Sequence, residues 1–138
     1  MTNEKHLDRI LCVDDDSDIL VVMQMSLSAV GGFTVQCCSS GLDALEMAPA
    51  FAPDLILLDV MMPGMDGQRT LRLLRERPSS RSVPVVFITA KVQLHEVEQL
   101  QALGTLGVLT KPFDPLRLPG QLRRLWETAP RTGGSHAV

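Results

Sequence analysis

The chain has 138 residues, of which 45% are hydrophobic and 21% charged, and its formal net charge at pH 7 is −3. This length and composition are typical of one globular domain, and the acidic balance argues against direct nucleic-acid binding. The first nine residues contain no apolar core, and no apolar run is long enough to span a bilayer. We therefore expect no signal peptide, no membrane segment and a cytoplasmic location. The cysteines Cys12, Cys37 and Cys38 lack the spacing of a zinc site and are expected to be small buried hydrophobes.

Short apolar runs alternate with helix-forming segments five times along the chain. The predicted strands are residues 9–13, 33–38, 55–58, 83–88 and 106–110. The predicted helices run from Asp16 or Ser17 to Gly31, from 41 to about Pro49, and over 67–77, 92–103 and 115–128. Pro119 and Gly120 predict an irregular last helix.

This alternation predicts an α/β fold with a parallel sheet and helices on both faces. Five strand–helix units favour the flavodoxin-like, doubly wound strand order 2-1-3-4-5 with five helices. We divide the sequence into an N-terminal extension (1–8), a folded domain (9–128) and a flexible tail (129–138).

Polar residues follow four of the five predicted strands. Asp14 and Asp15 leave the first strand, Asp59 the third, Thr89 the fourth and Lys111 the fifth. The carboxyl ends of parallel strands open on one edge of the sheet, so these side chains are expected to meet there. Three adjacent carboxylates repel unless a cation lies between them, and their oxygen ligands favour Mg²⁺ over zinc. An aspartate beside a metal, a lysine and a hydroxyl suits phosphoryl transfer onto the carboxylate itself, which gives an acyl phosphate.

Each of these residues also has a simpler interpretation. The acids at 14–16 are able to cap a helix, and for Asp16 we favour that role. Asp59 alone would be a solvated loop acid, and Thr89 and Lys111 alone would carry no information. Their occurrence together at four strand ends favours a functional site.

Four ordered motifs resemble the receiver domain of two-component response regulators (the CheY-like family), and the resemblance covers roughly Arg9 to Glu127. The motifs are Val13-Asp14-Asp15, Pro53 to Asp59 with Met62 to Gly67, Ile88-Thr89-Ala90, and Lys111-Pro112-Phe113. The resemblance implies that Asp59 accepts a phosphoryl group from a phosphohistidine on a histidine kinase or a histidine phosphotransfer protein. It also implies a Mg²⁺ cofactor, held by Asp15 directly, by Asp14 mostly through water, by Asp59 and by the backbone carbonyl of Met61.

The same resemblance implies how the site responds to phosphate. Lys111 would pair with Asp59 at rest and then bind a phosphoryl oxygen, while Thr89 would swing toward the phosphate. The small Ala90 would keep the approach open, and the Lys111–Pro112 peptide bond would be cis.

One position departs from the family pattern. Receivers usually carry Tyr or Phe three residues before the lysine, as a rotamer switch coupled to the threonine, but this chain has Val108. A valine cannot make an aromatic flip, so we expect a muted or altered output. Phe87 and Phe113 are expected to be core residues rather than substitute switches.

The sequence therefore predicts a single-domain response regulator that switches protein–protein interactions or relays phosphate. It would not be an enzyme beyond its own phosphorylation and dephosphorylation, and it would be a monomer or a weak dimer with an unidentified downstream protein target. An alternative is a degenerate receiver that serves as a scaffold without phosphorylation. A haloacid-dehalogenase-like enzyme would need a second aspartate at position 61, which is Met. The arginines of the third helix form either a docking patch or, by default, a solvated face.

Overall fold

A computed structural model describes residues 6–90 and 93–129. The first predicted residue of the fourth helix, Val92, and the predicted tail apart from Ala129 lie outside the described residues. The strands are β1 (Arg9–Val13), β2 (Thr34–Cys38), β3 (Leu55–Asp59), β4 (Val85–Thr89) and β5 (Gly107–Thr110). They form one parallel sheet in the order β2-β1-β3-β4-β5, which confirms the predicted topology.

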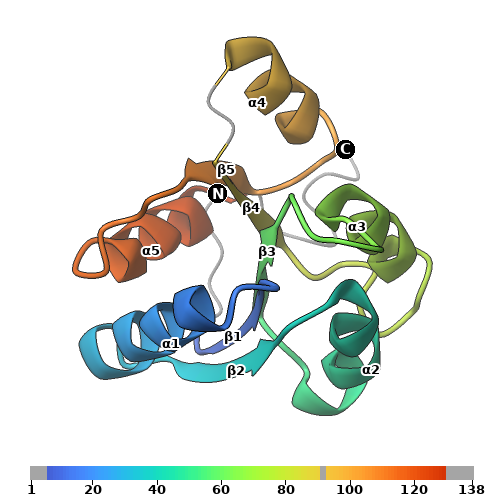
Figure 1. Ribbon diagram of the computed structural model, residues 1–138. Helices are drawn as coiled ribbons and strands as arrows, with labels where there is room; N and C mark the ends of the chain where they lie inside the picture. The colour runs from blue at the N-terminus through green and yellow to red at the C-terminus, as the bar shows by residue number, and fades with distance from the viewer. Residues whose placement is uncertain (1–5, 91–92, 130–138) are drawn as a thin grey trace.

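Helices cover both faces of this sheet (Figure 1). They are α1 (Ser17–Met25), a π-helical turn η1 (Ser26–Val30), α2 (Gly41–Phe51), α3 (Gly67–Arg75), α4 (Leu94–Gln101) and α5 (Leu118–Thr128). One apolar core lies between the sheet and α1, η1 and α5, and the other lies between the sheet and α2, α3 and α4. Among the described residues, no helix is long and apolar enough to cross a membrane.

The central strands supply both cores because successive side chains point to opposite faces of a sheet. In β1, Ile10 and Cys12 join the core under α1 and α5, whereas Leu11 and Val13 join the core under α2 and α3. Every residue of β3 and β4 is buried. Continuous apolar runs are what a strand covered on both sides requires, and they fix the strand ends that carry the polar residues.

The second helix runs through Pro49 and ends at Phe51, two residues beyond the predicted end. A proline inside a helix has no N–H for the carbonyl one turn earlier. In this protein Arg77 Nη1 donates a hydrogen bond of 3.4 Å to that carbonyl, Leu45 O. Ala52 then ends α2 in a left-handed conformation with φ of 53°. Most other boundaries differ from prediction by one or two residues, the usual uncertainty of helix and strand ends.

The last helix begins at Leu118, three residues later than predicted, and continues to Thr128. The irregularity predicted from Pro119 was wrong, because this proline lies in the first turn, where its missing N–H leaves no hydrogen bond unmade. Residues 114–117 instead form a turn in which Asp114 Oδ1 accepts from the N–H of Leu116 at 2.9 Å. The Ser26 hydroxyl donates to Pro115 O and so joins η1 to this turn.

Gly67, the first residue of α3, packs directly on the backbone at the end of β3. Its N–H donates to Val60 O at 2.9 Å. A Cβ atom at this position would lie 2.3 Å from Asp59 O and 2.9 Å from the Cα of Val60. Backbone atoms cannot rotate away as a side chain does, so only glycine allows α3 to begin this close to Asp59.

We predict that Gly67→Ala lowers the free energy of unfolding by about 1 to 3 kcal/mol, because overpacking forces backbone shifts. The measurement is the urea unfolding midpoint. Gly120→Ala is the matched control, because nothing lies within 4 Å of a Cβ there. Since alanine is the better helix former by about 1 kcal/mol, that control should be neutral or stabilising. Equal losses for the two variants would show that the close approach at Gly67 does not matter.

Candidate functional site

The ends of four of the five strands position polar residues at one edge of the sheet. Asp59 and Thr89 are the last residues of β3 and β4, Asp14 follows β1, and Lys111 follows β5. Hydrogen bonds between neighbouring strands fix these ends: Asp14 N donates to Cys38 O at 3.2 Å, and Lys111 N donates to Thr89 O at 2.8 Å. The site therefore lies where the winding of the sheet reverses, between β1 and β3.

Three carboxylates meet at this point. One carboxylate oxygen from each of Asp14, Asp15 and Asp59 lies within 4.8 Å of the others. Asp14 and Asp59 are buried, with 0% and 2% of their surface exposed, whereas Asp15 is exposed. The cluster thus has a buried side formed by strand ends and a side open to solvent.

Lys111 partly neutralises the negative charge of the two buried carboxylates. Its Nζ lies 2.8 Å from Asp14 Oδ2 and 3.3 Å from Asp59 Oδ1, so it pairs with both carboxylates and not with Asp59 alone. Burial works to lower the pKa of Lys111, but the ion pairs with Asp14 and Asp59 outweigh burial and raise it. Burial and the neighbouring Asp14 charge raise the pKa of Asp59, and Lys111 offsets only part of that rise.

The donor set fits a divalent cation with oxygen ligands. Asp14 Oδ2 is buried, and its ion-pair partner among the described residues is the Lys111 ammonium, 2.8 Å away. Asp14 Oδ1 accepts from the N–H of Asp16 at 2.9 Å. A buried oxygen with spare lone pairs beside the exposed Asp15 suits Mg²⁺, which retains several waters and takes one or two carboxylates.

The remaining predicted residues lie at or just after the ends of β3, β4 and β5. Thr89 is fully buried, and Ala90 is exposed directly after it. Met61, two residues after Asp59, is 56% exposed in the loop that follows β3. The peptide bond between Lys111 and Pro112 is cis, the isomer that the resemblance implied. Asp16 accepts hydrogen bonds from the N–H groups of Asp18 and Ile19, so its predicted role as the cap of α1 is confirmed.

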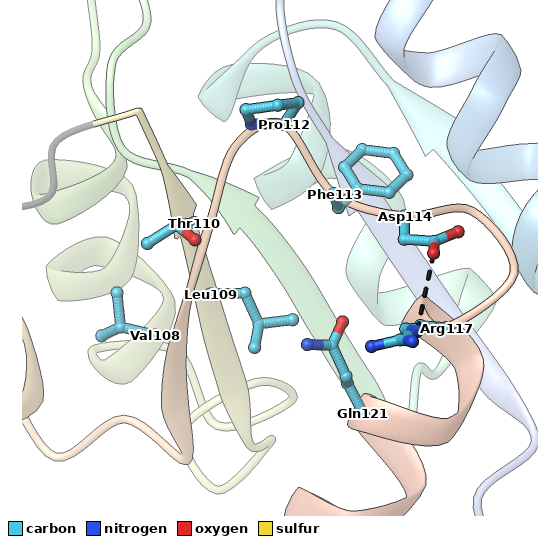
Figure 2. A pocket seen from close by; sticks show the side chains of 8 residues that line it. All are labelled: Val108, Leu109, Thr110, Pro112, Phe113, Asp114, Arg117 and Gln121. Atoms are coloured by element: carbon cyan, nitrogen blue, oxygen red, sulfur yellow. Dashed lines mark ion pairs between the residues drawn. The ribbon is translucent and has the colours of Figure 1, made fainter.

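Val108 lies in the middle of β5 and pairs in register with Phe87. Its side chain packs against the core under α2, α3 and α4, whereas Leu109 and Phe113 pack on the opposite side, with α5. Figure 2 shows a cavity of about 430 Å³ between β5 and α5. Its lining includes Val108, Leu109 and Phe113 together with Thr110, Pro112, Asp114, Arg117 and Gln121. Phe87 is fully buried and Phe113 is half-buried in the other core, so both are core residues, as predicted.

Sequence reasoning gave no role to Asp54, the residue before β3. Asp54 is buried at the opposite edge of the sheet, where its Oδ2 accepts from the N–H groups of Asp8 (3.0 Å) and Arg9 (2.8 Å). Arg9 in turn donates to Phe51 O at 2.7 Å and stacks over the Phe51 ring. The signal in the sequence is an acid directly before a buried strand, but its partners become visible only in the fold.

The fold and the site define an α/β domain of the flavodoxin-like class with a cluster of acids and a lysine at its switch point. The sequence matches the response regulator receiver domain over residues 10–123, and the chain belongs to that family. It is therefore a signalling domain of the two-component response regulators, a family in which phosphorylation of an aspartate is a general feature.

The similar proteins agree with this assignment. The chain is 41% identical to the response regulator PleD of Caulobacter vibrioides over 117 residues, which are 85% of this chain and 26% of PleD. It is 34% identical to the transcriptional regulatory protein CseB of Streptomyces coelicolor, over 97% of this chain and 54% of CseB. The chain thus spans about a quarter to a half of the length of these curated relatives. The solved structure of the Vibrio cholerae chemotaxis protein CheY4 is similar with a TM-score of 0.79 and 28% identity, and the match covers 87% of this chain and 99% of CheY4.

We predict that Asp59→Asn raises the free energy of unfolding by about 1 kcal/mol without divalent cations, because it removes one of two buried like charges whose repulsion Lys111 offsets only in part. The raised pKa of Asp59 determines how this gain in stability changes with pH. At low pH the wild-type carboxyl is protonated and the gain is absent; the gain appears as pH rises through the raised pKa of Asp59.

The measurement is urea unfolding in EDTA across this pH range. Glu46→Gln, an exposed acid in the middle of α2, is the matched control and should show no pH-dependent gain. Saturating Mg²⁺ should reduce the difference in the free energy of unfolding between Asp59→Asn and wild type. The reason is that a cation bound to the native state stabilises it, and wild type retains the Asp59 carboxylate as a ligand. A destabilised Asp59→Asn in EDTA would contradict the electrostatic account.

Proposed function

We propose that Asp59 accepts a phosphoryl group from a phosphohistidine of a histidine kinase or a histidine phosphotransfer protein. The phosphorylated domain then switches protein–protein contacts or passes the phosphoryl group onward. The observation that carries this proposal is the gathering of the Asp14, Asp15 and Asp59 carboxylates within 4.8 Å, with Lys111 Nζ 3.3 Å from Asp59. Membership of the receiver family supports it.

In the proposed reaction, an Asp59 carboxylate oxygen attacks phosphorus as the phosphorus–nitrogen bond to the histidine breaks. Mg²⁺ would supply positive charge that neutralises the carboxylates and the phosphoryl oxygens. Asp15 would hold the metal directly, Asp14 mostly through water, and Asp59 and the carbonyl of Met61 would complete the protein ligands. The ionised Asp59 is the reactive form, and Lys111 helps to keep it ionised by lowering its pKa.

Lys111 and Thr89 would bind the transferred group. The raised pKa of Lys111 keeps its ammonium charged, so it is able to leave the Asp59 oxygen and pair with a phosphoryl oxygen. The Thr89 hydroxyl is a rotatable donor at the end of β4, and the small side chain of Ala90 leaves the approach open. The phosphoryl group brings a charge of about −1.5 to −2, which biases the segment after Thr89 and hence α4.

The proposal includes a cytoplasmic location. Cys12, Cys37 and Cys38 are free thiols. Cysteines without disulfides are usual in a reducing compartment.

We predict that incubation with acetyl phosphate or phosphoramidate and Mg²⁺ adds one phosphoryl group to the protein, as read by intact mass. The adduct should be absent from Asp59→Asn and from wild type in EDTA, since both the nucleophile and the cation are required. Lys111→Gln should form it more slowly, because the cation that binds the phosphoryl oxygen is lost.

Glu46→Gln is the control for a neutral change of charge and should be phosphorylated like wild type. An adduct that persists in Asp59→Asn would show that another residue is the phosphoacceptor. No adduct on wild type with either donor would reject the phosphotransfer proposal and favour the phosphorylation-independent scaffold.

We predict that a phosphate mimic changes the amide NMR shifts of Thr89, Ala90 and residues of α4, and that Asp59→Asn removes these changes. The physical reason is that Thr89 and Lys111 are recruited to the new negative charge, which moves the segment leading to α4. Because Val108 replaces the usual aromatic residue, we expect smaller changes in β5 than in α4. Shifts confined to Asp14, Asp15, Asp59 and Lys111 would contradict switching through α4.

A further inference from the structure

The solvent face of α3 carries positive charge in a chain whose net charge is −3. Arg69 and Arg72 are exposed, and Arg75 is half-buried. Arg77 and Arg81 follow in the next loop, and the one acid between residues 69 and 81 is Glu76. The arginines therefore form a basic surface, which we call the α3 basic face and define as Arg69, Arg72 and Arg75.

Helix stability does not account for all of this charge. Arg72 and Arg75 lie in the last turn of α3, where cations suit the helix dipole. Arg69 lies in the first turn, where a cation opposes the dipole. In the described part of the chain, none of the three pairs with a carboxylate. Their charge is thus available to a partner.

A small cavity opens beside these arginines. It has a volume of about 190 Å³ and is lined by Gln68, Leu71, Arg72 and Arg75 of α3 and by Leu103, which follows α4. Counted from Gln68, the other α3 residues of the lining lie three, four and seven positions later, so all four belong to one stripe of the helix. Leu71 is buried and Leu103 is 45% exposed, and these two leucines supply the apolar part of a lining that also includes Arg72 and Arg75. Because a cavity of about 150 Å³ holds a benzene ring, this one accommodates one aliphatic or aromatic side chain.

Arg75 is held in place before any ligand arrives. Its Nη1 donates to Val83 O at 2.7 Å and to Ser80 O at 3.4 Å, and the Ser80 hydroxyl donates to Leu74 O at 2.7 Å. The guanidinium is therefore fixed between α3 and the loop before β4. A cation that is already ordered loses less conformational entropy when it pairs with a carboxylate, and the planar guanidinium fits a carboxylate with two hydrogen bonds.

We propose that the α3 basic face and its cavity form a docking site for an acidic protein segment that carries one apolar side chain between carboxylates. The apolar side chain enters the cavity against Leu71 and Leu103. The flanking carboxylates pair with Arg72 and Arg75, and Arg69 extends the positive surface toward the start of α3. The cavity contains none of the residues of the Asp59 site, so this interaction is separate from the proposed phosphotransfer.

Two features favour a protein segment over nucleic acid. An apolar lining that shares its cavity with two arginines matches a leucine or phenylalanine flanked by acids, whereas a nucleic-acid backbone requires a wider basic surface. The chain as a whole is acidic, so a long polyanion would be repelled outside α3.

The test uses a short fluorescein-labelled peptide of alternating Asp and Glu with one central leucine, and measures its Kd by fluorescence anisotropy. Arg72→Gln should weaken binding about tenfold, the effect of losing one charge-assisted hydrogen-bonded pair. Arg124→Gln removes the same charge from an exposed position on α5 and should leave the Kd within about twofold. Replacing the peptide's leucine by glycine should weaken binding several-fold, and bound peptide should shift the methyl resonances of Leu71 and Leu103.

Four results would overturn the proposal. They are equal losses for Arg72→Gln and Arg124→Gln, equal binding of the leucine and glycine peptides, no binding of the leucine peptide, and tighter binding of single-stranded DNA of the same charge. Asp59→Asn should bind the peptide as wild type does. The docking site and the phosphotransfer proposal therefore fail independently.

Discussion

The Lys111 ammonium holds two buried carboxylates together at the point where the sheet reverses its winding. Asp14 and Asp59 end neighbouring strands, and both lie in an environment that penalises charge. With Lys111 Nζ 2.8 Å from one carboxylate and 3.3 Å from the other, the repulsion between them is partly cancelled. This interaction allows the apolar strands β1 and β3 to pair side by side and still end in acids.

The cancellation is incomplete, and this has a chemical consequence. Asp59 keeps a raised pKa, because the one Lys111 ammonium is shared between two buried carboxylates. A site in which three carboxylates lie beside one lysine has excess negative charge and is less stable alone than with a cation. The features that would bind Mg²⁺ and a phosphoryl group are therefore the same ones that cost folding stability, a relation common in functional sites.

The surrounding packing keeps this cluster in place. Gly67 lets α3 begin against the backbone of Asp59, and the turn before α5 is tied to η1 through Ser26. Lys111 itself is fixed by the hydrogen bond from its N–H to Thr89 O. Arg75 plays a similar part on the other side of α3, where it joins the helix to the loop before β4 and leaves a small cavity beside Leu103.

The sequence by itself determined the strand order, the receiver family and the set Asp14, Asp15, Asp59, Thr89 and Lys111. It did so because buried parallel strands read as continuous apolar runs, and their ends must meet at one edge. Only the tertiary structure decided that Lys111 is shared between two carboxylates, that Arg77 compensates for Pro49, and that Asp54 joins β1 to β3. Each of these contacts joins residues at least 32 positions apart in the sequence. Their geometry depends on packing that local sequence patterns do not contain.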